Sequence, residues 1–431
     1  MALAESTQRS MNRAAISSAA AARRAALGTL VGAAMLPLQW QHLGATKLGH
    51  LRLFHIGIVA MILIGRPTLA GIRRTMFRAK PMMYGVLTLT FVATATAWYQ
   101  GAKAANPVQD FIYAMLGLLG GVVVATGLSE PAGRRLLAWA CPVTLVTFLY
   151  FFGHAMQAAG VHPITAYRQV LYGGQSDAVL LHQVFAVAFQ SAGTTADEET
   201  LSQARHDIFC ALLLSGFLSA IALPSERRPN RRVLIIGSIV AVVVLVAVSF
   251  SRATLIALLI PVLVGAYGVV TRARVSPLVL VGAFWSLATV PFLIGPVQAF
   301  IVNRFLNDTA SYQARSSAWS AFTASSIGSR LIAGGPELAT STHTILGDAI
   351  LRGDLLAGIG AAFIVVASIR LFRISAGRYL GAPSAARLAV VGLLSIFIVR
   401  SWTSGGGYLH LTSWLAVWTA AAILACPDYE V

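Results

Sequence analysis

Charged side chains are scarce in this sequence, and acidic ones are the scarcest. Only 11% of its 431 residues are Asp, Glu, Lys or Arg, and just 15 residues are acidic. Because a soluble domain carries about 25% charged residues, this composition excludes an ordinary water-solvated globule. Hydrophobic residues make up 57% of the chain, and the mean hydropathy is +0.74.

Cysteine is nearly absent, and one nucleotide-binding motif is missing altogether. The three cysteines, Cys141, Cys210 and Cys426, fall within or beside apolar runs, and an odd number predicts no disulfide framework. No G-x-x-x-x-G-K-[ST] segment is present, so the sequence holds no P-loop for ATP. No pair of acidic residues calls for a metal, and we expect no cofactor.

Long apolar runs are what the chain has in abundance. Many approach or exceed the ~20 residues that a helix needs to cross ~30 Å of hydrocarbon. They are unbroken, whereas the strands of a membrane barrel alternate apolar and polar residues. The sequence therefore predicts an all-α, polytopic integral membrane protein with about 12 transmembrane helices. We expect these helices at residues 28–44, 51–65, 82–99, 110–128, 135–153, 207–223, 233–250, 252–270, 277–295, 351–369, 387–402 and 409–426.

The basic residues indicate how the helices are oriented. The net charge is +17, but most Lys and Arg residues lie in short clusters in the N-terminal tail and in alternate connections. That distribution is typical of cytoplasmic loops and not of a nucleic-acid surface. We therefore expect a cytoplasmic tail at 1–27, one transmembrane domain at 28–426 and a cytoplasmic C-terminus at 427–431, in a bacterial cytoplasmic membrane.

Arg252 is the only charged residue between Arg232 and Arg272. One helix over 233–271 would be ~58 Å long, nearly twice the thickness of the hydrocarbon. Basic clusters bracket the run at both ends, so we expect two helices in a hairpin with its tip at the outer surface. Arg252 would lie at that tip, and Ser251 is expected to cap the returning helix. There the guanidinium could meet water, a lipid headgroup or a diphosphate.

Two long connections, at 154–206 and 296–350, are expected on the outer side with short interfacial helices. In the first, Thr195 and Glu198 have the spacing of a capping box, which predicts a helix start. The second is rich in basic side chains. It gathers Arg304, Arg315, Arg330, His343 and Arg352 with Asp308, Glu337, Asp348 and Asp354. Guanidinium suits a diphosphate and imidazole suits the removal of a hydroxyl proton, so this loop could hold an anion beside a base.

Three segments in order carry a resemblance to a known family. They are "SFSRATLIALL", "NRF…SYQARSSAW" and "GGP…STHTILGDAILRGDLLAG", within residues 233–370. The chain resembles the O-antigen ligase / O-antigen polymerase superfamily of bacterial membrane glycosyltransferases. Two departures stand out: the family often has Asn where Thr344 follows the histidine, and the glycine turn reads "AGGPE".

The resemblance implies a GT-C-like fold and a metal-independent, inverting transfer outside the cytoplasmic membrane. A glycan would move from a polyprenyl diphosphate, such as undecaprenyl diphosphate, to a hydroxyl of a glycolipid or growing polysaccharide. Arg252 and Arg315 would hold the diphosphate, and His343 would orient or deprotonate the acceptor. Arg304 and Arg330 are further candidates for binding substrate.

Two other functions fit parts of the sequence. A twelve-helix secondary transporter would account for the number of helices, although such carriers place polar groups at mid-membrane. A non-catalytic scaffold for envelope assembly would need neither Arg252 nor His343. Protein-directed oligosaccharyl transfer shares the features of the ligase and polymerase.

Overall fold

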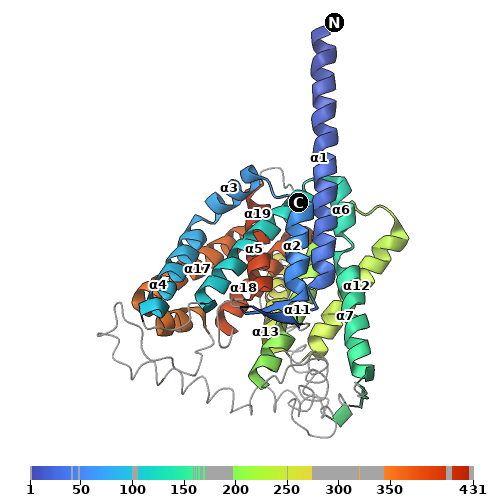
Figure 1. The fold of residues 1–431 in the computed structure, drawn as a ribbon. Coiled ribbons are helices and arrows are strands. Elements are labelled where there is room, and N and C mark those ends of the chain that lie inside the picture. Colours follow the sequence, from blue (N-terminus) through green and yellow to red (C-terminus); the bar gives the residue numbers. More distant parts are fainter. Residues whose placement is uncertain are drawn as a thin grey trace.

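The computed structural model is built almost entirely from helices (Figure 1). It describes residues 2–39, 42–46, 49–99, 105–158, 198–249, 251–273, 344–403 and 410–426, with Ser320 and a few isolated residues between 160 and 169. All structural statements below concern these residues.

The first part of the chain forms seven helices and a hairpin. Their bounds are α1 (Ala2–Met35), β1 (His42–Thr46), β2 (Gly49–Arg52), α2 (Leu53–Gly65), α3 (Leu69–Arg78), α4 (Lys80–Tyr99), α5 (Ala105–Leu128), α6 (Pro131–Leu137) and α7 (Ala140–Ala158). The two strands pair antiparallel, with Thr46 opposite Gly49 and Ala45 opposite His50.

The second part is helical throughout. Its elements are α11 (Glu198–Ala222), the 3₁₀ turn η2 (Leu223–Ser225), α12 (Pro229–Val248), α13 (Arg252–Ala273), α17 (Ile345–Gly381), α18 (Ala385–Thr403) and α19 (Leu411–Ala425). Most residues of α18 and all but one of α19 are buried, so these two helices form the centre of the bundle.

Seven described helical stretches are long and apolar enough to cross a membrane. They are Val108–Leu128, Pro131–Gln157, Arg205–Ser225, Pro229–Ala247, Arg252–Arg272, Leu355–Gly381 and Ala385–Thr403. The bent pair α2 and α3 would make an eighth if it were one span, and α19 is apolar but short. A multi-pass helical membrane protein is therefore confirmed, whereas the expected twelve spans stay a prediction.

The helix boundaries correct several expectations. The helix expected at 28–44 begins within the proposed tail and ends at Met35, because Pro37 lacks the N–H that a further turn would need. The connection expected at 154–206 is shorter, since α7 runs to Ala158 and α11 begins at Glu198. The helix expected at 277–295 lies outside the described residues.

Small residues allow two helix pairs to approach closely. A Cβ added at Gly85 of α4 would lie 2.5 Å from the carbonyl oxygen of Gly360 of α17, and one at Gly360 would lie 2.8 Å from the Leu89 nitrogen. In the same way, a Cβ at Gly121 of α5 would lie 2.6 Å from the Trp418 carbonyl carbon in α19. Close backbone contact through glycine is a common way for membrane helices to associate.

The bundle has two distinct ends. Figure 1 shows α3, α6 and the end of α19 at the end of the bundle from which α1 projects. At the opposite end of the bundle lie the ends of α1 and α18 and the starts of α2, α11, α13 and α19. The candidate site is at this second end.

Candidate functional site

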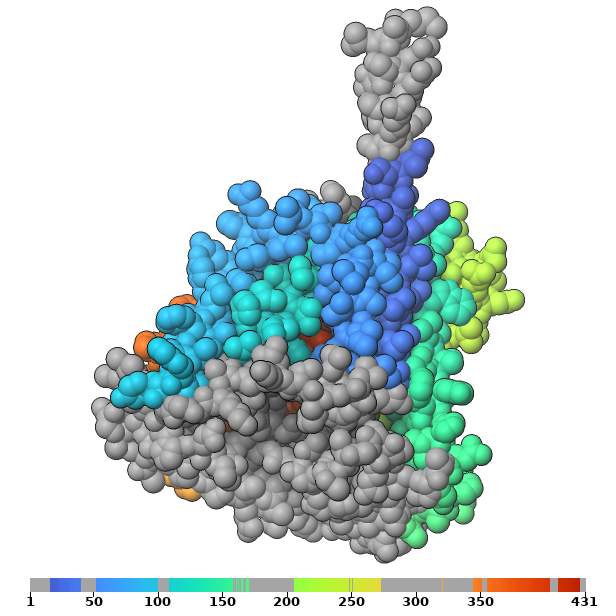
Figure 2. Space-filling view, in the orientation of Figure 1, coloured from blue at the N-terminus to red at the C-terminus, as the bar shows by residue number. Residues whose placement is uncertain are grey.

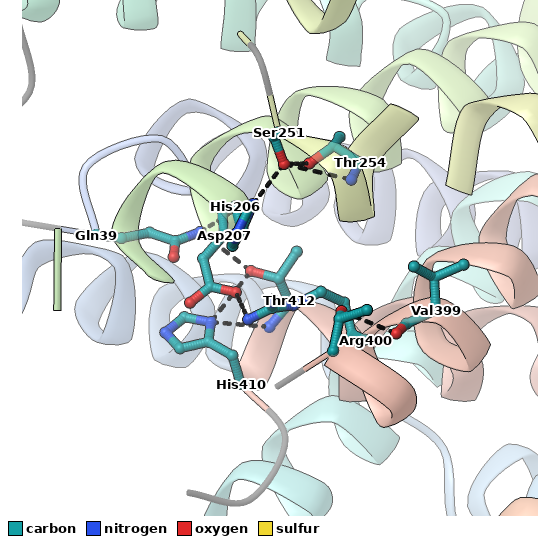
Figure 3. A network of polar contacts seen from close by, with 10 residues as sticks. Gln39, His206, Asp207, Ser251, Thr254, Val399, Arg400, His410 and Thr412 are labelled. Carbon is teal, nitrogen blue, oxygen red and sulfur yellow. Dashed lines mark hydrogen bonds and ion pairs between the residues drawn. The ribbon is translucent and has the colours of Figure 1, made fainter. Parts of the chain in front are cut away.

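A network of polar side chains joins residues of α11, α13, α18 and α19 and of the segment after α1, which are far apart in the sequence (Figure 3). It includes a buried ion pair between Arg400, near the end of α18, and Asp207, in the first half of α11. An Arg400 terminal nitrogen lies 2.8 Å from the Asp207 Oδ1 atom, and the two side chains are 2% and 6% exposed, respectively. Charges buried in this way are costly, and in membrane proteins they commonly mark functional sites.

The guanidinium of Arg400 keeps unused donor capacity. Its Nε and Nη1 atoms are buried and have no hydrogen-bond partner among the residues that the structure describes. An unsatisfied buried donor costs about 1–3 kcal/mol, so this side of Arg400 favours binding of an acceptor such as an anion or water. Arg205, two residues before Asp207 in α11, is also buried, at 1% exposure.

Gln39 ties the segment after α1 to this ion pair. Its side-chain nitrogen donates to the Asp207 carbonyl oxygen at 3.2 Å and to the Thr412 hydroxyl at 3.1 Å. Gln39 is fully buried. The amide therefore fixes α11, at Asp207, against the start of α19.

His410 caps α19 within the same network. Its Nδ1 atom accepts from the backbone N–H of Thr412 at 3.5 Å. Burial lowers the pKa of His410 to about 4; Arg52 and Arg400 also lower it, and the Asp207 carboxylate opposes them. The imidazole is therefore neutral near pH 7.

A second set of polar contacts adjoins His410. The His55 ring accepts from the Arg52 backbone N–H at its Nδ1 atom, 3.0 Å away, and its Nε2 atom lies 2.7 Å from the Tyr113 hydroxyl. With Nδ1 as an acceptor, a neutral His55 carries its proton on Nε2 and donates to Tyr113. Gln109 also donates to that hydroxyl at 2.7 Å. The centroids of the Tyr113 and His410 rings are 6.0 Å apart.

Ser251 connects the network to Arg252. The Ser251 hydroxyl lies 2.5 Å from both the His206 Nδ1 atom and the Thr254 hydroxyl, and it accepts from the Thr254 N–H at 3.3 Å. Ser251 is therefore the N-cap of α13, as the sequence predicts, and α12 and α13 are separate helices as expected. Arg252 is the first residue of α13 and is half-buried.

The other predicted site residues cannot be compared with this geometry. Arg304, Arg315, Arg330 and His343 all lie outside the described residues. The residue that follows His343, Thr344, is the N-cap of α17, and its hydroxyl accepts from the Gly347 N–H at 3.0 Å. Thr is a good N-cap, so the start of α17 is satisfied by its own side chain.

Sequence reasoning missed the buried members of the network. Arg205, Asp207, Arg400 and His410 were not among the candidates, although each interrupts or borders an apolar run. Arg205 and Asp207 lie close together in the sequence, and so do Arg400 and His410, but about 190 residues separate the two groups. No local motif spans such a separation.

The network's chemistry favours binding an anion. Arginines in a water-poor environment hold a phosphate strongly, and a helix N-terminus, such as that of α13, adds favourable N–H groups. The described residues contain no group of three or more His, Cys, Asp or Glu that could hold a metal ion.

Comparison with protein-family models and with curated proteins finds no match to this chain.

Proposed function

We propose that the chain is an O-antigen ligase-like or polymerase-like glycosyltransferase acting at the outer face of the cytoplasmic membrane. The observation that carries the proposal is the anchoring of Arg252. Ser251 caps α13 and contacts His206, one residue before the buried Asp207–Arg400 pair. A guanidinium at this position has neighbours that suit an anionic substrate.

The proposed donor is a glycan on polyprenyl diphosphate, and the acceptor is a hydroxyl on a glycolipid or growing polysaccharide. The bond between the anomeric carbon and the diphosphate oxygen breaks, and the acceptor oxygen forms a new bond to that carbon from the opposite side. The diphosphate leaves with the electron pair, and Arg252 and Arg315 stabilise its charge. His343 orients the acceptor hydroxyl or takes its proton. Arg304 and Arg330 contribute to binding of the donor.

We infer a GT-C-like arrangement of about twelve spans with both termini in the cytoplasm. The support is the distribution of charge between the two ends. Arg66, the arginines of α3, and Arg134 and Arg135 of α6 lie at the end that carries the end of α19 and the projecting part of α1. Clustered basic residues favour the cytoplasmic side, which puts Arg252 on the outer side.

A secondary transporter is the second candidate, and the buried Asp207–Arg400 pair is the observation in its favour. Paired charges among membrane helices often line a path for ions or substrates. However, transporters bind near the bilayer midplane, whereas Asp207 is the third residue of its apolar stretch and Arg400 lies near the end of its own. The position of the pair therefore supports chemistry at a membrane surface.

The test uses purified protein in lipid nanodiscs with a polyprenyl-diphosphate glycan and an acceptor panel of glycolipid and polysaccharide. The variants Arg252→Ala, Arg315→Ala and His343→Ala should each lower release of polyprenyl diphosphate by about a hundredfold. Arg231→Ala, which removes an exposed arginine from α12, is the matched control and should keep full activity. Full transfer by all three variants, with unchanged thermal stability, would contradict the proposal.

A further inference from the structure

The chain bends sharply between α2 and α3. The two helices form an angle of 118°, and the residue at the break, Arg66, has a left-handed backbone with φ of 52°. Pro67 follows, and the Thr68 hydroxyl then accepts from the Gly71 N–H at 3.1 Å to cap α3. The change of direction is therefore built into the local backbone.

One face of α3 packs on the bundle. A Cβ added at Gly71 would lie 2.8 Å from Val122 of α5, so the helix backbone rests directly on that neighbour. Thr75 is buried, and its hydroxyl donates to the Gly71 carbonyl oxygen at 2.9 Å. Ala79, just after the helix, is also buried. This face holds α3 firmly in its orientation.

The opposite face combines aromatic, aliphatic and cationic side chains. Leu69 and Phe77 are 85% and 80% exposed, and Arg73 lies between them at helical i, i+4 spacing with Arg74 beside it, both exposed. Figure 2 shows this segment, in light blue, on the surface at the end from which α1 projects. The sequence holds no acidic residue between Glu5 and Asp110. The exposed face is therefore strongly cationic.

We propose that α3 lies in the membrane interface and binds anionic phospholipid headgroups through Arg73 and Arg74. Phe77 and Leu69 enter the acyl region, and the guanidinium groups meet the lipid phosphates. Interfacial helices combine these two kinds of contact, and the fixed bend after α2 turns α3 along the membrane plane. The inference does not depend on glycosyl transfer.

The two other orientations of α3 fit the exposed face poorly. As the second half of a broken span, it would place Arg73 and Arg74 in hydrocarbon, which is costly. In bulk water, it would leave Leu69 and Phe77 almost fully exposed on one rigid face. Only the interface satisfies both kinds of side chain.

The depth of α3 tests its orientation. A spin label attached at Phe77→Cys, in a Cys426→Ser background, reports collisions with oxygen and with a water-soluble nickel chelate in nanodiscs; Cys141 and Cys210 are buried and should resist labelling. We expect a depth just below the lipid phosphates. A label near the bilayer centre, or one fully accessible to nickel, would overturn the proposal.

Lipid preference tests the role of the arginines. We expect binding of phosphatidylglycerol to the purified protein to weaken about tenfold in Arg73→Gln/Arg74→Gln. The control Arg231→Gln/Arg232→Gln removes the same charge from the exposed start of α12 and should bind as the unaltered protein does. Equal weakening in both variants, or equal binding of phosphatidylcholine, would contradict a headgroup site on α3. Displacement by soluble glycerol phosphate alone would show a free-phosphate site instead and would likewise overturn it.

Discussion

At the scale of single residues, the buried pair of Asp207 and Arg400 is a costly feature of the fold. Desolvation of two charges often exceeds their attraction, so such a pair is weak evidence for stability and stronger evidence for a role. Both side chains are nearly inaccessible, and Arg400 uses only one of its terminal nitrogens on Asp207. Retaining the pair is understandable if Arg400 also serves a bound anion.

Breaking the pair should destabilise the protein more than removing it. We expect Asp207→Asn to lower the free energy of unfolding by about 3 kcal/mol, since it leaves the Arg400 charge buried without compensation. The double variant Asp207→Leu/Arg400→Met should lose less than either single variant, because no charge remains. Thermal unfolding in detergent micelles measures this, and a double loss equal to the sum of the single losses would contradict the account.

His410 should make stability depend on pH. Its pKa is about 4 in the folded protein and about 6.5 when unfolded, so the unfolded chain binds a proton more readily between these values. Stability is therefore fully present above about pH 6.5 and declines as the pH falls towards 4.

The variant His410→Asn removes the imidazole that titrates but keeps a cap at the start of α19, since Asn is a good N-cap. We expect its melting temperature to fall less than that of the unaltered protein between pH 7.5 and pH 4.5. An identical fall in both proteins would assign the acid sensitivity to other groups.

The sequence predicts Ser251 and Arg252 and misses the rest of the site network for a physical reason. Arg252 stands out as a lone charge between two basic clusters, and the capping role of Ser251 follows from its type and place. Asp207 and Arg400 pair, and His410 lies in the same network, although α11, α18 and α19 are separate elements of the sequence. That convergence depends on tertiary packing, which local patterns do not encode.

At the scale of elements, apolar runs predict where helices exist better than where they end. Every expected range except 277–295, which lies outside the described part of the chain, overlaps a helix. The ends differ because polar residues can extend a helix beyond the membrane, as α17 does from Ile345 to Gly381. The hairpin of β1 and β2 was not predicted; its strands cover the short expected connection at 45–50 and the adjoining ends of the helices expected at 28–44 and 51–65.

The close crossing of α4 and α17 gives a prediction at this scale. Gly360→Ala should lower stability, because its Cβ would lie within 3 Å of the α4 backbone and the helices would have to separate. Gly377→Ala, in the same helix, is the matched control: a Cβ there meets nothing within 4 Å and adds helix propensity worth about 1 kcal/mol.

Unfolding temperatures of the two variants provide the comparison. We expect Gly360→Ala to melt below the unaltered protein and Gly377→Ala to melt at or above it. Equal melting of the two variants would show that α4 can move away from α17 without cost.

At the scale of the whole molecule, the two ends have different chemistry. One end carries α3, whose exposed cationic face suits anionic lipid, and the other carries the network around Asp207, Arg400 and Arg252. Arg315 and His343 are the further residues that we propose for this site. We infer that donor diphosphate and acceptor meet there.

The central claim is that Arg252 helps to hold a polyprenyl diphosphate, and a structure with that ligand tests it most directly. Cryo-electron microscopy of the protein in nanodiscs with a non-transferable polyprenyl-diphosphate glycan should show the diphosphate within hydrogen-bond distance of the Arg252 guanidinium. Diphosphate density at the α3 end of the molecule, or midway along the helices, would contradict the account.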